Sequence, residues 1–502
     1  MLDAFLPFLS GLGLALQPIN LVYCLVGALV GTLIGVLPGI GVTATVAMLL
    51  PVTFFLPPLT SLIMLAGIYY GAQYGGSTTA ILVNLPGESS SMVTCLDGYK
   101  LARQGRAGPA LAVAALASLF AGIFATLFIA LFAPPLADLA LLFGAAEYFA
   151  LMIVGLIAAI VLAQGSLLTA LGMIVFGLLL SMVGTDLNSG AARMTFGIPE
   201  LSDGIGFVPI AMGLFAIGEI ARNLESGADR SVLAMRIGSL WPSQDDLRRS
   251  TPAAIRGTLI GSVLGVLPGG GALLSSFAAY AVEKRLAREP GRFGEGAIEG
   301  VAAPEAANNA GAQTSFIPLL TLGIPANPVM ALMVGAMMIQ GIQPGPEVMV
   351  KRPDLFWGLI ASMLVGNVML VIINLPLIQI WVSLLKIPYR LLFPSILVFC
   401  CIGVYTLNNS ALEVMMILVF GVMGYAFLKW KCEAAPLMLA FILGPLMEEN
   451  LRRVMLLAKG EPSYLLTRPI SIGLILVAVG LVLILVVPAF KQTRAEAFRE
   501  AP

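Results

Sequence analysis

Four short polar clusters hold the residues of this chain that are best suited to bind a ligand. They are Gly39–Thr45, Gly75–Thr79, Gly269–Ser276 and Asn308–Ser315, and each lies within or beside an apolar stretch. Their members are glycines, small hydroxyls and amides, with almost no cations. Such residues at a helix N-terminus hold an anion through backbone N–H groups and hydroxyls. The carbonyl ends of broken helices can hold a small cation. The clusters therefore predict a site for a carboxylate and a coupling ion.

The predicted substrate ligands come from these clusters and from one asparagine that follows the second of them. They are Gly39, Gly41, Thr43, Thr45, Ser77, Thr78, Thr79, Asn84, Gly269, Gly270, Ser275, Ser276, Asn308, Asn309, Gln313 and Thr314. A Na⁺ ion is expected near Gly39, Gly269 and Thr314, and no metal ligand is certain. The alternative is that small residues only permit close helix packing in the membrane. The asparagines suit helix capping as well as ligand binding.

Four glutamates lie near or within apolar segments and are the acidic candidates. Glu88, Glu219 and Glu305 lie near such segments, and Glu147 lies within one. Intramembrane carboxylates can relay protons, but each of these is read first as a boundary or packing residue. The scarcity of carboxylates favours Na⁺ over H⁺ as the coupling ion, and no other cofactor is expected.

A repeated segment is predicted to position these residues. Gly27–Gly41 recurs as Gly257–Gly271 at a constant offset of 230, with nine of fifteen positions identical. We interpret this match as an internal duplication. Pro38 and Pro268 interrupt the two copies, because proline removes a backbone donor and clashes with the preceding helical turn. Paired broken helices in two halves of a chain indicate the binding site of a transporter.

The composition indicates a polytopic membrane protein. Of 502 residues, 59% are hydrophobic and only 11% are charged, against about 25% charged in soluble proteins. At about 20 residues per span, on the order of ten to twelve spans are expected. The net charge is zero, which implies no nucleic-acid partner. The chain has no histidine, and so lacks the commonest general base and metal ligand. An enzyme is therefore not expected.

The expected fold is all-α, with two inverted repeats, re-entrant hairpins and broken helices. The first half covers 1–222, with a hairpin at 20–56 and an unwound element at 60–87, interrupted at Gly71–Thr79. A basic cytoplasmic connector covers 223–256. The second half covers 257–502, with a hairpin at 257–281 and an unwound element at 300–327. Basic residues flank only the second hairpin on both sides, which favours insertion of the two hairpins from opposite faces. The topology of 328–489 stays open.

Three long motifs resemble a known family. They are Gly35–Phe54, Tyr69–Leu111 and Glu299–Ala336, and they are similar to the large membrane permease subunit of tripartite tricarboxylate transporters, the TctA family. The resemblance implies a multi-pass secondary transporter of the bacterial inner membrane that imports tricarboxylates or related carboxylates on a Na⁺ or H⁺ gradient. It also implies a periplasmic solute-binding protein and a small membrane subunit as partners. An elevator-like motion is expected by analogy.

Two other classes of function are alternatives to this interpretation. An intramembrane enzyme would need paired aspartates, a metal cluster or a serine–histidine dyad within the spans, and the chain lacks histidine. A passive anion channel would carry flux without a coupling ion or a delivery protein. A permease for a different organic anion is the nearest alternative within the transporter class.

Overall fold

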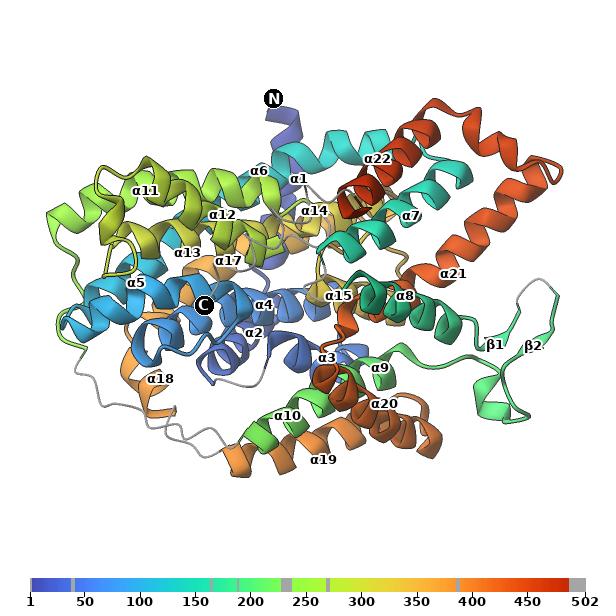
Figure 1. Cartoon of the computed structure of the whole chain (residues 1–502), viewed down its shortest axis with the longest axis horizontal. Coiled ribbons are helices and arrows are strands. Elements are labelled where there is room, and N and C mark those ends of the chain that lie inside the picture. Colours follow the sequence, from blue (N-terminus) through green and yellow to red (C-terminus); the bar gives the residue numbers. More distant parts are fainter. Residues whose placement is uncertain are drawn as a thin grey trace. The chain divides into compact units, whose positions relative to one another are not determined.

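The structure is a computed structural model that describes residues 2–37, 41–162, 166–186, 189–226, 237–267, 271–384 and 389–486. Nearly every element is a helix, and the two strands of the described residues, β1 (Gly184–Thr185) and β2 (Ala192–Arg193), form one small antiparallel hairpin. The chain forms two compact units (Figure 1). The all-α fold expected from the sequence is confirmed.

The first unit comprises Met1–Leu136 and Glu219–Gly403. It contains most of the helices: α1 (Leu2–Ala15), α2 (Pro18–Val36), α3 (Val42–Phe54), α4 (Pro58–Val83), η1 (Ser89–Ser91), α5 (Met92–Arg103), most of α6 (Ala107–Ala140), all but the first residue of α10 (Gly218–Ser226), α11 (Gln244–Leu264), α12 (Gly271–Leu286), η4 (Pro290–Arg292), α13 (Glu299–Thr314), α14 (Phe316–Leu322), α15 (Pro328–Ile339), α16 (Glu347–Lys351), α17 (Pro353–Asn374), α18 (Ile378–Leu384) and most of α19 (Tyr389–Asn408).

The second unit comprises Ala137–Gly218 and Val404–Pro502. Its elements are α7 (Ala145–Leu162), α8 (Leu167–Ser181), β1, β2, η2 (Pro199–Leu201), α9 (Phe207–Ala211), the π segment η3 (Met212–Ile217), α20 (Ala411–Lys429), α21 (Ala434–Leu457), η5 (Pro462–Leu466) and α22 (Pro469–Val486). Each unit takes segments from both expected halves, so the chain does not divide at residue 222. Both copies of the repeat, 27–41 and 257–271, lie in the first unit, although they belong to different expected halves.

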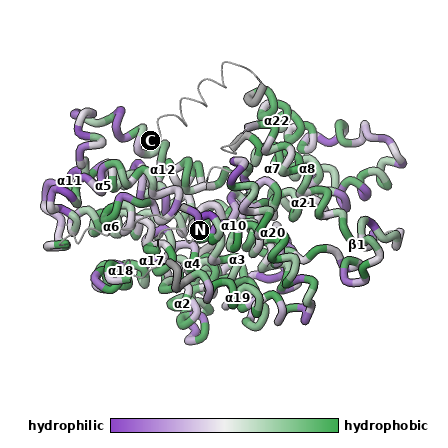
Figure 2. Tube along the Cα trace, turned by 60° about the horizontal axis from the view of Figure 1, so that its bottom comes forward, coloured by the Kyte–Doolittle hydropathy of each residue, from purple (hydrophilic) through white to green (hydrophobic). Residues whose placement is uncertain are grey.

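Apolar helices dominate both units. Among the described residues, α2, α6, α17 and α20 are long and apolar enough to cross a membrane, and shorter apolar helices of 10–17 residues accompany them. The chain is a multi-pass membrane protein. In Figure 2 hydrophobic residues run along most helices, and hydrophilic residues gather around α5 and α11 of the first unit. The latter region carries the basic residues expected to face the cytoplasm.

The two copies of the repeat pack in the same way. In the first copy, Gly27, Gly31 and Gly35 of α2 place their Cα atoms directly against the carbonyl oxygens of Met64, Ile68 and Ala72 on α4. In the second copy, the corresponding glycines of α11 lie against the backbone of α13, at Ala303, Ala307 and Gly311. No room exists for a side chain at these contacts, which is how small residues bring membrane helices together. Each contacted residue of α13 lies 239 positions after its counterpart on α4.

The expected interruption at Gly71–Thr79 differs from the structure, where α4 is continuous from Pro58 to Val83. Gly71 and Gly75 face α2, at the carbonyl oxygens of Ala28 and Thr32. These glycines serve close packing, and this helix has no internal proline to break it. The corresponding helix of the second copy does break, at Ser315, because Pro318 has no N–H to offer the carbonyl of residue 314.

The helices on the two sides of each break pack differently in the two copies. In the second copy, α11 and α12 pack against each other and both lie on α13. In the first copy α3 leaves α2 and packs against α4 and α15, because α4 and α17 cover α2. Buried residues of α4, α5, α6, α11 and α13, many of them alanines, form a hydrophobic core that joins these helices.

Ion pairs stabilise the second unit. Glu147, one of the acidic candidates, is 1% exposed and accepts a 2.8 Å hydrogen bond from Arg468 Nε. Asp186 pairs with Arg193 at 2.9 Å and with Arg452 at 2.5 Å. These contacts tie α7 to the start of α22, and the β hairpin to α21. Glu147 is therefore part of a structural ion pair, as the packing interpretation predicted.

Candidate functional site

The start of α3, at the first repeat's break, is held by two carboxylates of the chain itself. Gly41 N donates a 3.0 Å hydrogen bond to Glu219 Oε1, and Val42 N donates a 3.2 Å hydrogen bond to Glu88 Oε1. Both carboxylates are partly buried. Free N–H groups and the aligned peptide dipoles attract negative charge at this end of a helix. This end of α3 therefore already binds acid groups in the way predicted for a substrate.

The start of α12, at the second repeat's break, faces uncharged groups instead. Gly271 adopts φ +40° and lies beside the Asn327 side chain. Its carbonyl oxygen accepts a 2.7 Å hydrogen bond from Ser275 Oγ, and Ser275 in turn lies against Gly311 of α13. The positive φ favours glycine at position 271.

Tyr69 of α4 connects these two helix starts. Its hydroxyl accepts a 3.2 Å hydrogen bond from Asn327 Nδ2, and it also interacts with Ser315 and Glu88. Glu88 in turn interacts electrostatically with Glu219. Neither Tyr69 nor Asn327 was predicted from the sequence. The correspondence between the two copies pointed to them: at the offset of 239 that relates α4 to α13, Glu88 corresponds to Asn327 and Tyr69 corresponds to Asn308.

Asn308 is the predicted ligand with the most informative surroundings. Its side chain is 1% exposed, and neither its Nδ2 nor its Oδ1 has a hydrogen-bond partner among the described residues, which leave out 268–270. One helical turn away on either side, α13 contacts α12: the carbonyl of Pro304 accepts a 3.2 Å hydrogen bond from Ser276, and Gly311 lies against Ser275. Residues three and four apart share a helix face, so Asn308 lies on the face of α13 that packs against α12.

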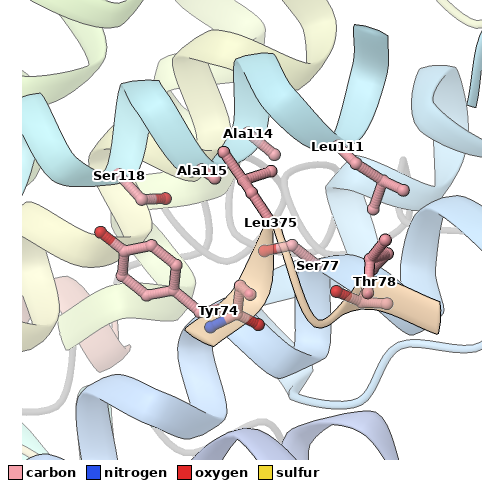
Figure 3. Close-up of a pocket in the computed structure, with 10 residues that line it drawn as sticks. Tyr74, Ser77, Thr78, Leu111, Ala114, Ala115, Ser118 and Leu375 are labelled. Atoms are coloured by element: carbon pink, nitrogen blue, oxygen red, sulfur yellow. The ribbon is translucent and has the colours of Figure 1, made fainter. Parts of the chain in front are cut away.

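A second polar region surrounds a small pocket between α4, α6 and the end of α17 (Figure 3). Ser77 and Thr78 line it from α4, and Ser118 lines it from α6. Its cavity volume is about 10 Å³, which is room for about one water molecule. As it stands, the pocket is too small for a tricarboxylate.

Glu305 of α13 lies behind this pocket. Its side chain is fully buried, and its two carboxylate oxygens accept hydrogen bonds from the hydroxyls of Ser77 and Thr94. Ser77 was predicted to bind substrate directly, and the structure joins it to this carboxylate. The sequence analysis named Glu305 as an acidic candidate but did not connect it with Ser77.

The other amides of α13 point towards α6. Asn309 Nδ2 donates a 2.7 Å hydrogen bond to Ser118 Oγ, and Gln313 Oε1 accepts a 3.0 Å hydrogen bond from Thr126. Gln313 Nε2 has no hydrogen-bond partner in the part of the chain that the structure describes. Thr314 faces the opposite way, with its hydroxyl close to the Gly261 carbonyl of α11. One helix thus sends its predicted ligands in three directions, and only some of them can meet one substrate.

The remaining predicted ligands lie in separate places. Thr43 and Thr45 lie in the first turn of α3, where the Thr45 hydroxyl donates to the Gly41 carbonyl. Thr79 joins α4 to the end of α2 through the Gly35 carbonyl, at 3.2 Å. Asn84 is exposed and ends α4 in the left-handed conformation, φ 58°, which is a capping position. The predictions at Pro38, Gly39, Pro268, Gly269 and Gly270 lie outside the described residues.

Comparison with known proteins now identifies the family. A family model described as "Tripartite tricarboxylate transporter TctA family" matches residues 21–439, which include both helix starts and the pocket. The chain belongs to the TctA family. It is therefore a membrane permease of the tricarboxylate transporter type, and the resemblance stated from the three motifs is confirmed.

Two proteins of Agrobacterium vitis are similar to this TctA family chain. "Uncharacterized 52.8 kDa protein in TAR-I ttuC' 3'region" is 59% identical over 500 residues and covers both chains completely. "Uncharacterized protein in TAR-II ttuC' 3'region" is 56% identical over 240 residues, which are 48% of this chain and 99% of that protein. No solved structure matches the chain.

Proposed function

We propose that this TctA family chain is the large permease subunit of a secondary transporter that imports tricarboxylates or related carboxylates. It works in the bacterial inner membrane on a Na⁺ or H⁺ gradient. A periplasmic solute-binding protein delivers the substrate, and a small membrane subunit completes the complex. These partners follow from the tripartite nature of the family.

The observation that carries the site is the unpartnered amide of Asn308. Buried polar side chains almost always have hydrogen-bond partners, and hydrocarbon surroundings offer none. Asn308 lies one turn from the contact of Gly311 with Ser275, next to the start of α12. A carboxylate bound there would accept from Asn308 Nδ2 and from free N–H groups at the helix start. The carboxylates already bound at the start of α3 support this chemistry.

Substitution of Asn308 by leucine tests the proposal sharply. Replacement of an unpartnered buried polar group by an apolar one of similar shape leaves folding stability unchanged or raised. Loss of a hydrogen bond to a charged group costs about 1.5–3 kcal/mol, which weakens substrate binding on the order of tenfold to a hundredfold. Asn308→Leu should therefore keep its melting temperature and lose uptake at low substrate concentration.

The assay is uptake of radiolabelled citrate by cells that express the chain with its genomic neighbours. Ser383→Ala, which removes an exposed hydroxyl of α18, is the matched control and should transport normally. Normal uptake by a stable Asn308→Leu variant would show that Asn308 only packs. Flux of equal size without an ion gradient or a delivery protein would favour a passive channel. Uptake of another organic anion in place of citrate would correct the substrate.

A further inference from the structure

Glu305 is a buried carboxylate that the substrate site does not use. It lies on α13, it is 0% exposed, and among the described residues the hydroxyls of Ser77 and Thr94 are the hydrogen-bond donors to its oxygens. An ionised carboxylate away from water costs several kcal/mol unless a cation compensates it. The position that corresponds to it in the first copy, at the offset of 239, is Ala66. The carboxylate is thus a feature of one copy alone.

No cation compensates Glu305 among the described residues. The groups that act on its carboxylate are the hydroxyls of Ser77, on α4, and Thr94, on α5. Two titratable groups lie close enough to sense its charge, Tyr74 of α4 and Cys95 of α5, and both are neutral acids. None of the groups that act on Glu305 is a cation. Binding of a proton would neutralise this side chain without a partner cation.

We infer that Glu305 binds the proton that is co-transported with the substrate, and that Ser77 connects it to the pocket. This inference rests on the proposed transport function. The step is a simple protonation, in which a proton from the water-accessible side joins the carboxylate and no group leaves. When the transporter releases the proton on the other side, the carboxylate forms again.

The two hydroxyls suit both protonation states of Glu305. A hydroxyl donates one hydrogen bond and accepts two, so either group can turn and accept from a protonated carboxyl. Ser77 has a second acceptor ready, the Gln73 carbonyl oxygen at 3.1 Å. Ser77 also lines the pocket of Figure 3, whereas Glu305 does not. A proton can therefore arrive from the pocket through Ser77 without a change of backbone.

Na⁺ is the other ion that could neutralise this carboxylate. Na⁺ binds to hydroxyl and carbonyl oxygens as well as to carboxylates, and the hydroxyls of Ser77 and Thr94 lie beside Glu305. The coupling test below separates the two ions, because accumulation driven only by the Na⁺ gradient would overturn the assignment of the proton.

The first test is spectroscopic and does not depend on the substrate. Infrared spectra of the full-length chain in lipid, recorded at neutral pH, should contain the C=O absorption of a protonated carboxylic acid. Glu305→Gln should remove one component of it, and Ser77→Ala should shift the frequency of that component. Glu347→Gln, at an exposed glutamate paired with Lys351, is the control and should change nothing. An absorption that Glu305→Gln leaves intact would overturn the inference.

The second test measures coupling. Proteoliposomes that contain the transporter complex are given a pH gradient or a Na⁺ gradient, and radiolabelled citrate is followed. Glu305→Gln should keep citrate counterflow, which needs no net proton movement, and lose accumulation driven by the pH gradient. Accumulation at the wild-type level by this variant would refute the role. Absence of citrate counterflow in the wild type would count against the proposed substrate, while the infrared result would still decide whether Glu305 binds a proton.

Discussion

A methyl group added at Gly31 should force α2 away from α4. The new Cβ would lie 2.8 Å from the Cα and carbonyl carbon of Ile68, and closer still to its carbonyl oxygen. Real Cβ atoms essentially never approach another heavy atom within 3.0 Å. The obstacle is backbone, so no side chain can rotate to relieve it. The helices must separate by roughly 0.5–1 Å, which forfeits a quarter to a half of the attraction between facing atoms.

The expected cost of Gly31→Ala can be set against a matched glycine. Overpacking of this kind costs about 1–3 kcal/mol. Gly172, within α8, has no neighbour within 4 Å of its added Cβ, so Gly172→Ala should gain up to about 1 kcal/mol from helix propensity alone. Gly31 also lies inside a helix, so this gain is common to both variants, and they should differ by the overpacking cost of about 1–3 kcal/mol. Gly261→Ala should resemble Gly31→Ala, because its Cβ meets the backbone of Ala307 in the second copy.

Thermal unfolding of the full-length protein in one detergent gives the comparison. Gly31→Ala and Gly261→Ala should melt below the wild type, and Gly172→Ala should melt at or above it. If Gly31→Ala melts as high as Gly172→Ala, the two helices are not in the close contact described here, and the equivalence of the two copies loses its main support.

Two buried aspartates outside the candidate membrane spans give further predictions. Asp97 is fully buried and accepts hydrogen bonds from three backbone N–H groups of the loop 294–297. Asp97→Ala should lower the free energy of unfolding by several kcal/mol, at about 1–3 kcal/mol for each N–H group left without a partner. Asp97→Asn should lower it less, because the amide oxygen still accepts hydrogen bonds. Melting curves check both variants. Burial raises the pKa of Asp246, but hydrogen bonds from Arg106 and Ser243 outweigh it, and the pKa lies below its ordinary value. A carboxylate whose pKa is lowered in the folded state stabilises the fold above about pH 4, and this stabilisation is lost as the pH falls through the pKa of the folded state. The difference in melting temperature between wild type and Asp246→Asn should therefore be constant at neutral pH and shrink only in acid.

The duplication and the helix breaks could be predicted because they depend on local chemistry. Proline cannot donate to a helix wherever it occurs, and identical glycines at a fixed offset are visible in a single chain. The partners of those glycines could not be predicted. Nothing local to Gly31 indicates that Ile68 covers it, since that contact depends on how two helices pair.

The error at Gly71–Thr79 has a related cause. Glycines that break a helix and glycines that allow two helices to touch look alike in a sequence, and only the presence of a packing partner separates them. Similarly, Glu88 and Glu219 lie 131 positions apart, and only the fold brings both to the start of α3. The acidic candidates were identified correctly as residues, but their partners required the structure.

The two offsets of the repeat explain why Asp97 serves one copy alone. The glycines of α2 and α11 are related by 230 positions, whereas their contacts on α4 and α13 are related by 239. Nine additional residues therefore lie between the break and the partner helix in the second copy. The connection from α3 to α4 is residues 55–57, and that from α12 to α13 is residues 287–298. Asp97 binds the N–H groups of this longer connection, together with the Tyr280 hydroxyl of α12. The added length needs a fixed anchor, because it joins the helix that carries Ser275 to the helix that carries Glu305 and Asn308.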